Sequence, residues 1–191
     1  MFRVIFVFLF SSAVFAVTST DVEKYLNEIK TLKANFIQED LTNKVLAEGI
    51  LHLSRPGKLR IEYTNPFQSA IFANGGVTTY YDKELDEVSN IPTSSTPLHF
   101  LLGDKVAFDE NIKIKDFKET KEEITILLYE TEKQEQGTLI LIFTKPLTLK
   151  EIRIINELGQ EISMSFFDTE FNKPINNSIY NFINPRFKRK I

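Results

Sequence analysis

The sequence contains no cysteine, which excludes disulfide bonds and a thiol nucleophile. Tryptophan is also absent, and seventeen phenylalanines supply most of the large aromatic surface. Histidine occurs only at positions 52 and 99, outside any metal-binding spacing such as H-E-x-x-H. The sequence therefore predicts no metal site, and its 191 residues fit a single domain.

Strong charge and catalytic motifs are lacking too. The formal net charge is −3, so no overall basic surface is available to attract nucleic acid phosphates. The chain has no G-x-G-x-x-G or P-loop motif for nucleotides and no G-x-S-x-G serine motif. Its carboxylates fall mostly on the polar sides of predicted strands or in loops, and no pair is marked for acid–base chemistry. We therefore expect no enzyme, no cofactor and no nucleic acid partner.

The N-terminus carries an apolar run, Val4–Phe10, which follows the basic Arg3 and leads to a small-residue stretch ending at Ala16. Such a run is too short to cross about 30 Å of hydrocarbon as a helix, and it is typical of a signal peptide. We predict cleavage after Ala16, which gives a signal peptide at 1–16 and a single domain at 17–191. No cysteine follows this site to carry acyl chains, and no later run is long enough for a membrane span. We therefore expect a soluble protein exported to the periplasm.

Two helices are predicted. The first begins at Thr20, whose hydroxyl has capping-box spacing to Glu23. Its apolar stripe has helical spacing and consists of Val22, Tyr25, Leu26, Ile29 and Leu32. The second covers 96–103, between a threonine and a glycine, with Pro97 at the first helical position. The segment 173–177 has no clear period and is left unassigned.

Elsewhere the apolar period changes to two, which predicts strands with one dry and one wet face. The expected strands cover 34–40, 44–54, 58–63, 69–73, 77–82, 85–89, 112–118, 123–130, 138–145, 147–156 and 161–168. Ten or eleven antiparallel strands predict a mainly β fold, with a single highly curved antiparallel sheet forming an incomplete β-barrel around an apolar cavity. The helices would cover this cavity as an α-helical lid. A two-sheet sandwich, which buries the same residues without a cavity, is the alternative.

Several motifs, in order along the chain, carry a resemblance to one family. They are F-x-Q at 36–38, G-x-L-x-L-x-R-P-G-K-L-R-x-E-Y at 49–63, Y-D at 81–82, T-P-L-H-F-L-L from 96 and L-T-L-K-E-I-R-I-I-N-E-L-G-Q-E-I-S-M-S-F from 147. On these residues the chain resembles the outer-membrane lipoprotein carrier proteins, the LolA family. The resemblance implies an incomplete β-barrel with a helical lid and a chaperone role in outer membrane biogenesis.

The resemblance also implies what the protein binds. Its partners would be triacylated lipoproteins, an inner-membrane ABC transporter complex that releases them, and either an outer-membrane acceptor or the outer membrane directly. The protein would act as a monomer that binds acyl chains and catalyses no reaction. The alternative is a lipid- or lipoprotein-sensing regulatory module on the same half-barrel fold. A lipid hydrolase is a second alternative.

Arg55 and Pro56 separate two of the predicted strands. The resemblance implies that Arg55 is a lid latch, whose guanidinium donates hydrogen bonds to backbone carbonyls of the lid in the empty protein. Leu101 and Leu102 are the expected acceptors by matching position. Proline fixes φ and lacks an N–H, so Pro56 ends the strand and lets the arginine turn inward. An exposed loop arginine is the alternative.

Regular strand faces and the second helix supply the candidates for the acyl-chain cavity. The predicted cavity residues are Phe36, Leu51, Leu53, Leu59, Ile61, Phe72, Leu98 and Phe100. The sequence leaves open which face of each strand lines the cavity, and it does not identify the lipoproteins carried.

Overall fold

Eleven strands form one antiparallel sheet in the computed structural model, which describes residues 16–188 except positions 41, 43, 97–98, 133–136 and 157. The strands are β1 (Thr31–Asp40), β2 (Val45–Ser54), β3 (Lys58–Asn65), β4 (Ser69–Asn74), β5 (Val77–Asp82), β6 (Glu87–Pro92), β7 (Ile112–Glu119), β8 (Glu123–Glu130), β9 (Thr138–Thr144), β10 (Thr148–Ile155) and β11 (Glu161–Phe171). Their order is β6-β5-β4-β3-β2-β1-β11-β10-β9-β8-β7. The predicted signal peptide, apart from Ala16, lies outside the described residues.

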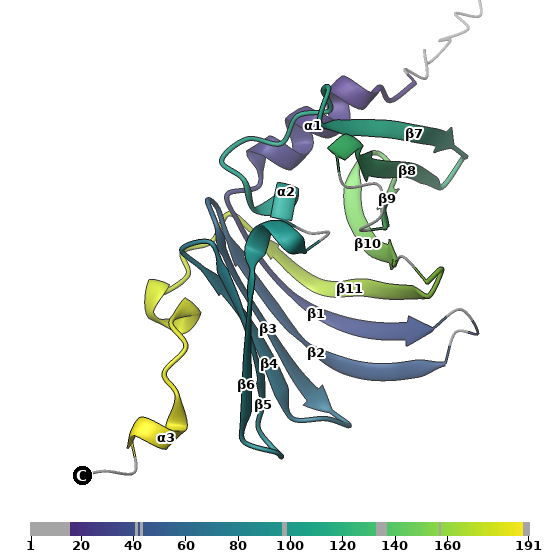
Figure 1. The fold of residues 1–191 in the computed structure, drawn as a ribbon. Coiled ribbons are helices and arrows are strands. Elements are labelled where there is room, and N and C mark those ends of the chain that lie inside the picture. The colour runs from purple at the N-terminus through teal and green to yellow at the C-terminus, as the bar shows by residue number, and fades with distance from the viewer. Residues whose placement is uncertain are drawn as a thin grey trace, which may run out of the picture.

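The sheet curls without closing, since β6 and β7 are its two edges and do not pair with each other within the described part of the chain. The helical segments are α1 (Ser19–Glu28), η1 (Thr93–Ser95), α2 (His99–Leu102), η3 (Asn177–Tyr180) and α3 (Pro185–Lys188). Figure 1 shows the sheet bent into a half-barrel with α1 and α2 at one end. A sheet of this many twisted strands curls because of its accumulated twist. The predicted incomplete barrel is confirmed, and the chain does not form the alternative two-sheet sandwich.

Helix α1 starts two residues earlier than predicted. The cap predicted at Thr20 is wrong, because Thr18 is the N-cap. Its hydroxyl accepts a hydrogen bond from the Asp21 N–H at 3.2 Å, and the Asp21 carboxylate accepts one from the Thr18 N–H at 2.9 Å. Thr18 with Asp21 and Thr20 with Glu23 have the same capping spacing, so the sequence offers two overlapping starts. Leu32, predicted in the helical stripe, lies in β1.

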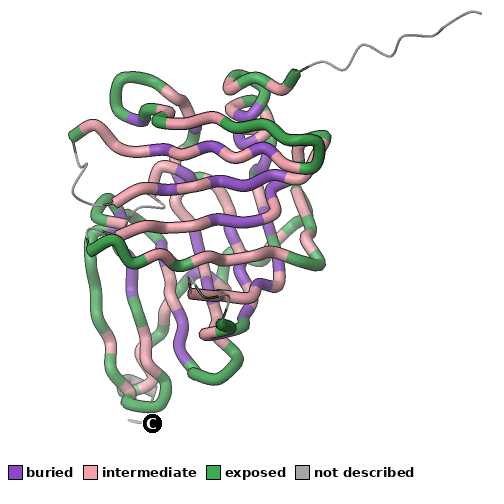
Figure 2. The backbone as a smooth tube through the Cα atoms, turned by 90° about the vertical axis from the view of Figure 1, so that its right-hand side faces the viewer, coloured by how far each residue is buried: buried purple, intermediate pink, exposed green. Residues whose placement is uncertain are grey.

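The concave face of the sheet and the inner side of α1 form one hydrophobic core. Buried and less buried residues alternate along most central strands, as Figure 2 shows, so these strands give one row of side chains to this core. Its completely buried side chains include Val22, Phe36, Ile124, Ile126, Leu141 and Phe143. On β2 the residues Ala47, Gly49, Leu51 and Leu53 are all buried on this face. This face and the lid helices position the site described below.

The chain after β11 crosses to the convex face of the sheet. Residues 172–186, here called the strap, run along the outer side of β3–β6 (Figure 1). Tyr180 is completely buried there. The ring centroid of Phe182 lies 5.4 Å from that of Phe72 and 5.3 Å from that of Tyr81. A crossing segment needs no regular apolar period, which is why its start could not be assigned from the sequence.

His52 lies on the convex face between Lys33 and Arg60, its cross-strand neighbours. Its Nδ1 is buried and has no hydrogen-bond partner among the described residues. Burial lowers the pKa of His52, and the positive charges of Arg60 and Lys33 lower it further against the opposing effect of Glu62. The folded protein therefore resists protonation of this histidine.

We expect the protein to lose stability in acid because of His52. The unfolded chain takes up this proton near the ordinary histidine pKa of 6.5, whereas the folded chain takes it up only at lower pH. The stabilisation that neutral His52 contributes is fully present above the unfolded-chain pKa of 6.5. It is lost as the pH falls below that value and through the lower pKa that His52 has in the folded protein. His52→Gln should reduce the difference between urea midpoints measured at about pH 8 and about pH 5. An unchanged difference in His52→Gln would contradict the assignment.

Candidate functional site

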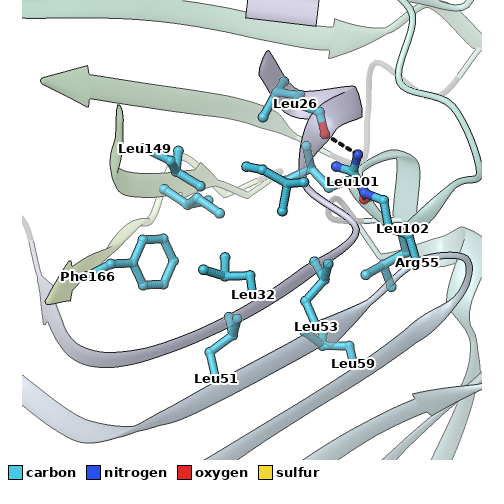
Figure 3. A pocket seen from close by; sticks show the side chains of 12 residues that line it. Leu26, Leu32, Leu51, Leu53, Arg55, Leu59, Leu101, Leu102, Leu149 and Phe166 are labelled. Atoms are coloured by element: carbon cyan, nitrogen blue, oxygen red, sulfur yellow. Dashed lines mark hydrogen bonds between the residues drawn. The ribbon is translucent and has the colours of Figure 1, made fainter. Parts of the chain in front are cut away.

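Twelve side chains enclose a small apolar cavity between the concave face and the helices α1 and α2 (Figure 3). The lining residues are Leu26, Ile29, Leu32, Leu51, Leu53, Arg55, Leu59, Leu101, Leu102, Leu149, Ile152 and Phe166. Strand alternation directs the side chains from β1, β2, β3, β10 and β11 to the same face. Among the described residues of this lining Arg55 is the one that carries a charge, so the site is chemically suited to an apolar ligand.

The cavity is nearly filled by its own walls. Its volume is ≈ 40 Å³, whereas a dry engineered cavity that binds benzene has about 150 Å³. The space is therefore too small for a single aromatic ring, and also for an alkyl chain. An apolar guest can enter only if one of the helices that close the cavity moves away. The structure thus shows this site closed.

Arg55 ties both helices to the end of β2. Its Nε donates a hydrogen bond to the Leu101 carbonyl of α2 at 2.6 Å, and Nη1 donates one to the Leu26 carbonyl of α1 (Figure 3). Its backbone N–H donates to the Lys30 carbonyl at 2.9 Å. Leu26 lies in the last turn of α1, where helix carbonyls have no partner within the helix and carry partial negative charge. A cation placed there gives the carbonyl a hydrogen-bond donor and interacts favourably with the negative end of the helix dipole.

The hydrogen-bond partners predicted for Arg55 match this geometry in part. Leu101 accepts from Arg55, but the Leu102 carbonyl accepts instead from the Gly57 N–H at 2.7 Å. Leu26 was not predicted as an acceptor. Arg55 is partly buried against these carbonyls and is not an exposed loop arginine; burial lowers its pKa to about 10. The guanidinium therefore stays protonated at neutral pH, and each of its bonds is a hydrogen bond from a charged group.

The two lid helices differ in how firmly they are attached. The Tyr25 hydroxyl of α1 accepts a hydrogen bond from a backbone N–H of β10 at 2.9 Å. The Asn27 side chain of α1 donates to the Val106 carbonyl and accepts from the Val106 N–H, both at 2.8 Å. Helix α2 is four residues long and is held by the bonds just described and by His99, whose Nε2 lies 3.6 Å from the Glu130 carboxylate. Helix α2 is therefore the part of the lid that is easier to release.

Most of the predicted site residues lie on the concave face. Leu51, Leu53 and Leu59 line the cavity together with the three predicted latch residues. Phe36 and Ile61 lie on the same face but farther along the strands, where both are buried in the core. Phe100 is partly buried against this core. Leu98 lies outside the described residues. The strand face that meets the cavity is therefore the one that carries Leu51, Leu53 and Leu59.

Phe72 is the exception, and its assignment to the cavity has to be corrected. It lies on the convex face, where the Arg60 guanidinium carbon is 5.3 Å from its ring centroid and the strap covers it. In β4 the side chains alternate, so that Ile71 and Ala73 pack on the concave side and Phe72 points the other way. Both faces of this strand are apolar because both are covered.

Half of the lining could not be assembled from the sequence. The cavity residues not predicted from the sequence are Leu26, Ile29, Leu32, Leu149, Ile152 and Phe166. All six belong to apolar stripes that were recognised in the sequence, but their convergence depends on how α1 lies on the sheet and on the pairing of β1 with β11. The available signals were the helical spacing of Leu26, Ile29 and Leu32 and the period-two alternation in β10 and β11.

The middle of the concave face is closed by two aromatic rings that meet above a glycine. Gly49 of β2 pairs with Phe36 of β1 on one side and with Tyr63 of β3 on the other. The two ring centroids are 5.5 Å apart and the rings are nearly perpendicular, at 88°. A Cβ at position 49 would lie 2.6 Å from Phe36 Cζ and would also meet the Glu62 carbonyl oxygen. Only glycine leaves room for this arrangement.

Gly49→Ala should therefore destabilise the protein. The added methyl group has to displace both a packed ring and a backbone oxygen, and overpacking of this kind costs about 1–3 kcal/mol. The measurement is the free energy of unfolding in urea at neutral pH. A variant as stable as the wild type would show that β2 can shift away from its neighbours at this point.

The comparisons with known proteins agree with this architecture. A family model described as outer membrane lipoprotein carrier protein LolA matches residues 27–183. The chain belongs to the LolA family. This is a family of carriers, and the half-barrel is a lipoprotein-binding carrier fold. In the described part of the chain, no helix combines the length and the apolar character needed to cross a membrane.

Individual relatives are distant. The chain is 26% identical over 190 residues to an outer-membrane lipoprotein carrier protein of Legionella pneumophila (strain Corby), covering 95% of this chain and 94% of the relative. It is 25% identical over 166 residues to an uncharacterized protein of Rickettsia prowazekii (strain Madrid E), covering 87% and 76%. A solved putative outer membrane lipoprotein-sorting protein domain from Vibrio parahaemolyticus superposes with a TM-score of 0.50 at 10% identity, covering 85% and 94%. At that identity the likeness shows the fold alone.

Proposed function

We propose that this protein is a periplasmic chaperone that binds the acyl chains of triacylated lipoproteins released from the inner membrane and delivers them to the outer membrane. One observation carries the proposal: a LolA-family half-barrel contains a closed apolar cavity, at which Arg55 donates hydrogen bonds to carbonyls of both lid helices. The cavity lining supplies apolar contacts and a latch, which is what a carrier needs.

The free energy of moving acyl chains into water explains why such a carrier is needed. Each buried CH₂ group contributes about 0.8 kcal/mol, so a sixteen-carbon chain is worth on the order of 10 kcal/mol against water. Three such chains on one lipoprotein would almost never leave a membrane unaided. A carrier must shield them and still release them, and the empty protein must not expose the same apolar surface. Collapse of the lid onto the leucine-rich face meets the last requirement.

The proposed cycle uses the two helices differently. Acyl chains enter when α2 leaves the sheet and Arg55 loses its bond to Leu101, while α1 keeps its contacts through Tyr25 and Asn27. On delivery, the bonds of Arg55 form again and the cavity closes. The free energy gained when the lid closes thereby offsets part of the free energy lost when the acyl chains leave the cavity. Release of the cargo is feasible for this reason.

The remaining parts of the proposal concern route and partners. The signal peptide at 1–16 directs export and is removed, and the mature chain receives lipoprotein from an inner-membrane ABC transporter complex. It passes this cargo to an outer-membrane acceptor or to the outer membrane directly. The protein acts as a monomer and without catalysis.

Purification of residues 17–191 from a periplasm, without detergent, tests the proposal. Mass spectrometry of the bound material should find triacylated lipoproteins in stoichiometric association with the carrier. The proposal fails if no lipoprotein co-purifies, or if the only bound lipids are free phospholipids. A lipoprotein that binds but is never handed to outer membranes would instead support a sensing module.

A further inference from the structure

The concave face contains a second space beyond the closed cavity. At the end away from the lid, an open groove of ≈ 530 Å³ is lined by residues that include Ala47, Tyr63, Phe67, Ile71 and Tyr80. We call this space the mouth groove and the closed cavity of Figure 3 the lid chamber. Both spaces share β1, β2 and β3, the lid chamber at Leu51 and Leu53 and the mouth groove at Ala47.

The aromatic pair described above stands between the two spaces. Along β2 the inward residues run from Leu53 and Leu51 through Gly49 to Ala47, and Gly49 is the point at which the rings of Phe36 and Tyr63 meet. These three residues make one row across β1, β2 and β3, which we call the divider.

The divider is fixed in place. Phe36 is completely buried, and its ring presses against the bare backbone of Gly49. The Tyr63 hydroxyl donates a hydrogen bond to Gln38 Oε1 at 3.0 Å, which fixes the second ring against the first. Burial raises the pKa of Tyr63, so this hydroxyl keeps its proton at neutral pH. Because packing fixes the Phe36 ring and a hydrogen bond fixes the Tyr63 ring, the two rings form a rigid barrier between the lid chamber and the mouth groove.

We propose that Phe36 and Tyr63 form the floor of the acyl site and limit how far a chain can extend along the strands from the lid. This inference rests on the function proposed above. Phe36 lies four positions along β1 from Leu32, which lines the lid chamber, and four strand steps span about 13 Å. A straight sixteen-carbon chain, built from C–C bonds of about 1.5 Å, measures about 19 Å. Chains of that length therefore bend at the divider or leave part of their length outside it.

Binding of saturated fatty acids of increasing length tests the floor. In the wild type, affinity should rise about fourfold for each added carbon and then level off once the chain reaches Phe36, at about ten carbons. Phe36→Ala opens the lid chamber to the mouth groove, so the rise should continue for several more carbons. Tyr63→Leu removes the second ring and its hydrogen bond at a partly buried position, and it should shift the plateau in the same direction. If circular dichroism shows that Phe36→Ala does not fold, Tyr63→Leu provides the test in its place.

Phe67→Ala is the matched control, because Phe67 lines only the mouth groove and is exposed. It should leave the plateau where the wild type has it. A wild-type affinity that rises without levelling off, or a plateau unchanged in both divider variants, would overturn the floor. Failure of the wild type to bind fatty acids of any length would instead count against the acyl-carrier function itself.

Discussion

Arg55→Leu is expected to accumulate in the lipoprotein-bound form, with the balance between loaded and empty carrier shifted at least about tenfold. The closed state loses two hydrogen bonds from a charged group, to Leu26 and Leu101, each worth about 1.5–3 kcal/mol. In the open, loaded state the bond to Leu101 is already absent because α2 has left the sheet, so the substitution costs the closed state at least this one bond more than the open state. Uptake from inner membranes should survive, and hand-over to outer membranes should stall. The measurement is the fraction of carrier recovered with bound lipoprotein, with and without acceptor membranes.

Two further variants sharpen this test. Arg55→Lys keeps the charge but replaces the planar fork with a single point donor, so it should hold one carbonyl at most and give an intermediate shift. Arg60→Leu removes an arginine that also bonds a backbone carbonyl, that of Ile179, but on the convex face. It should load and release normally. Normal release by Arg55→Leu, or its failure to load at all, would show that Arg55 is not a latch.

Leu59→Glu is expected to fold and to lose lipoprotein binding by at least about a hundredfold, because an unpaired carboxylate among apolar side chains is costly. Any pairing of the new carboxylate with Arg55, which lines the same cavity, would hold the lid closed and lower loading as well. Burial raises the pKa of such a carboxyl, so binding should partly return in mild acid as the group becomes neutral. The readout is lipoprotein bound per carrier across that pH range.

Controls at and beside this position separate charge from size and from general damage. Leu59→Met keeps the volume and apolar character and should bind normally. Lys58→Glu adds a carboxylate at the preceding residue, on the opposite, convex side of β3, and should also bind. Wild-type binding by a folded Leu59→Glu protein would remove this residue from the acyl site.

The strands were predictable because their pattern is local. Period-two alternation gave all eleven, and one apolar face per strand implied a curved sheet with a covered concave side. The start of α1 was less certain, since Thr18 and Thr20 each begin a capping box and only the folded chain distinguishes them. The assignment of Phe72 to the cavity was wrong for a different reason. The strap, which comes from residues far along the chain, covers the outer side of β4, and the sequence of β4 itself does not indicate this contact.

The latch could be predicted only in part. Arg55 and Leu101 followed from the resemblance to a family, whereas the bond to Leu26 arises from the position of α1 on the sheet. The two residues are 29 positions apart, and no spacing rule links an arginine after a strand to the last turn of the preceding helix. The unpaired carbonyls at a helix end indicate that some donor is needed there, but they do not identify it.

We expect the lid to be shut when the carrier is empty and to open when acyl chains are bound. The chain has no cysteine, so two introduced cysteines can carry spin labels without interference. Ser95, next to α2, and Lys30, at the junction of α1 and β1, are both exposed and suit this purpose. We expect a short, narrow distance distribution in the empty protein and a longer, broader one after loading with lipoprotein, with part of the empty Arg55→Leu protein already in the longer form. The same distribution in the empty and the loaded wild-type protein would contradict the account.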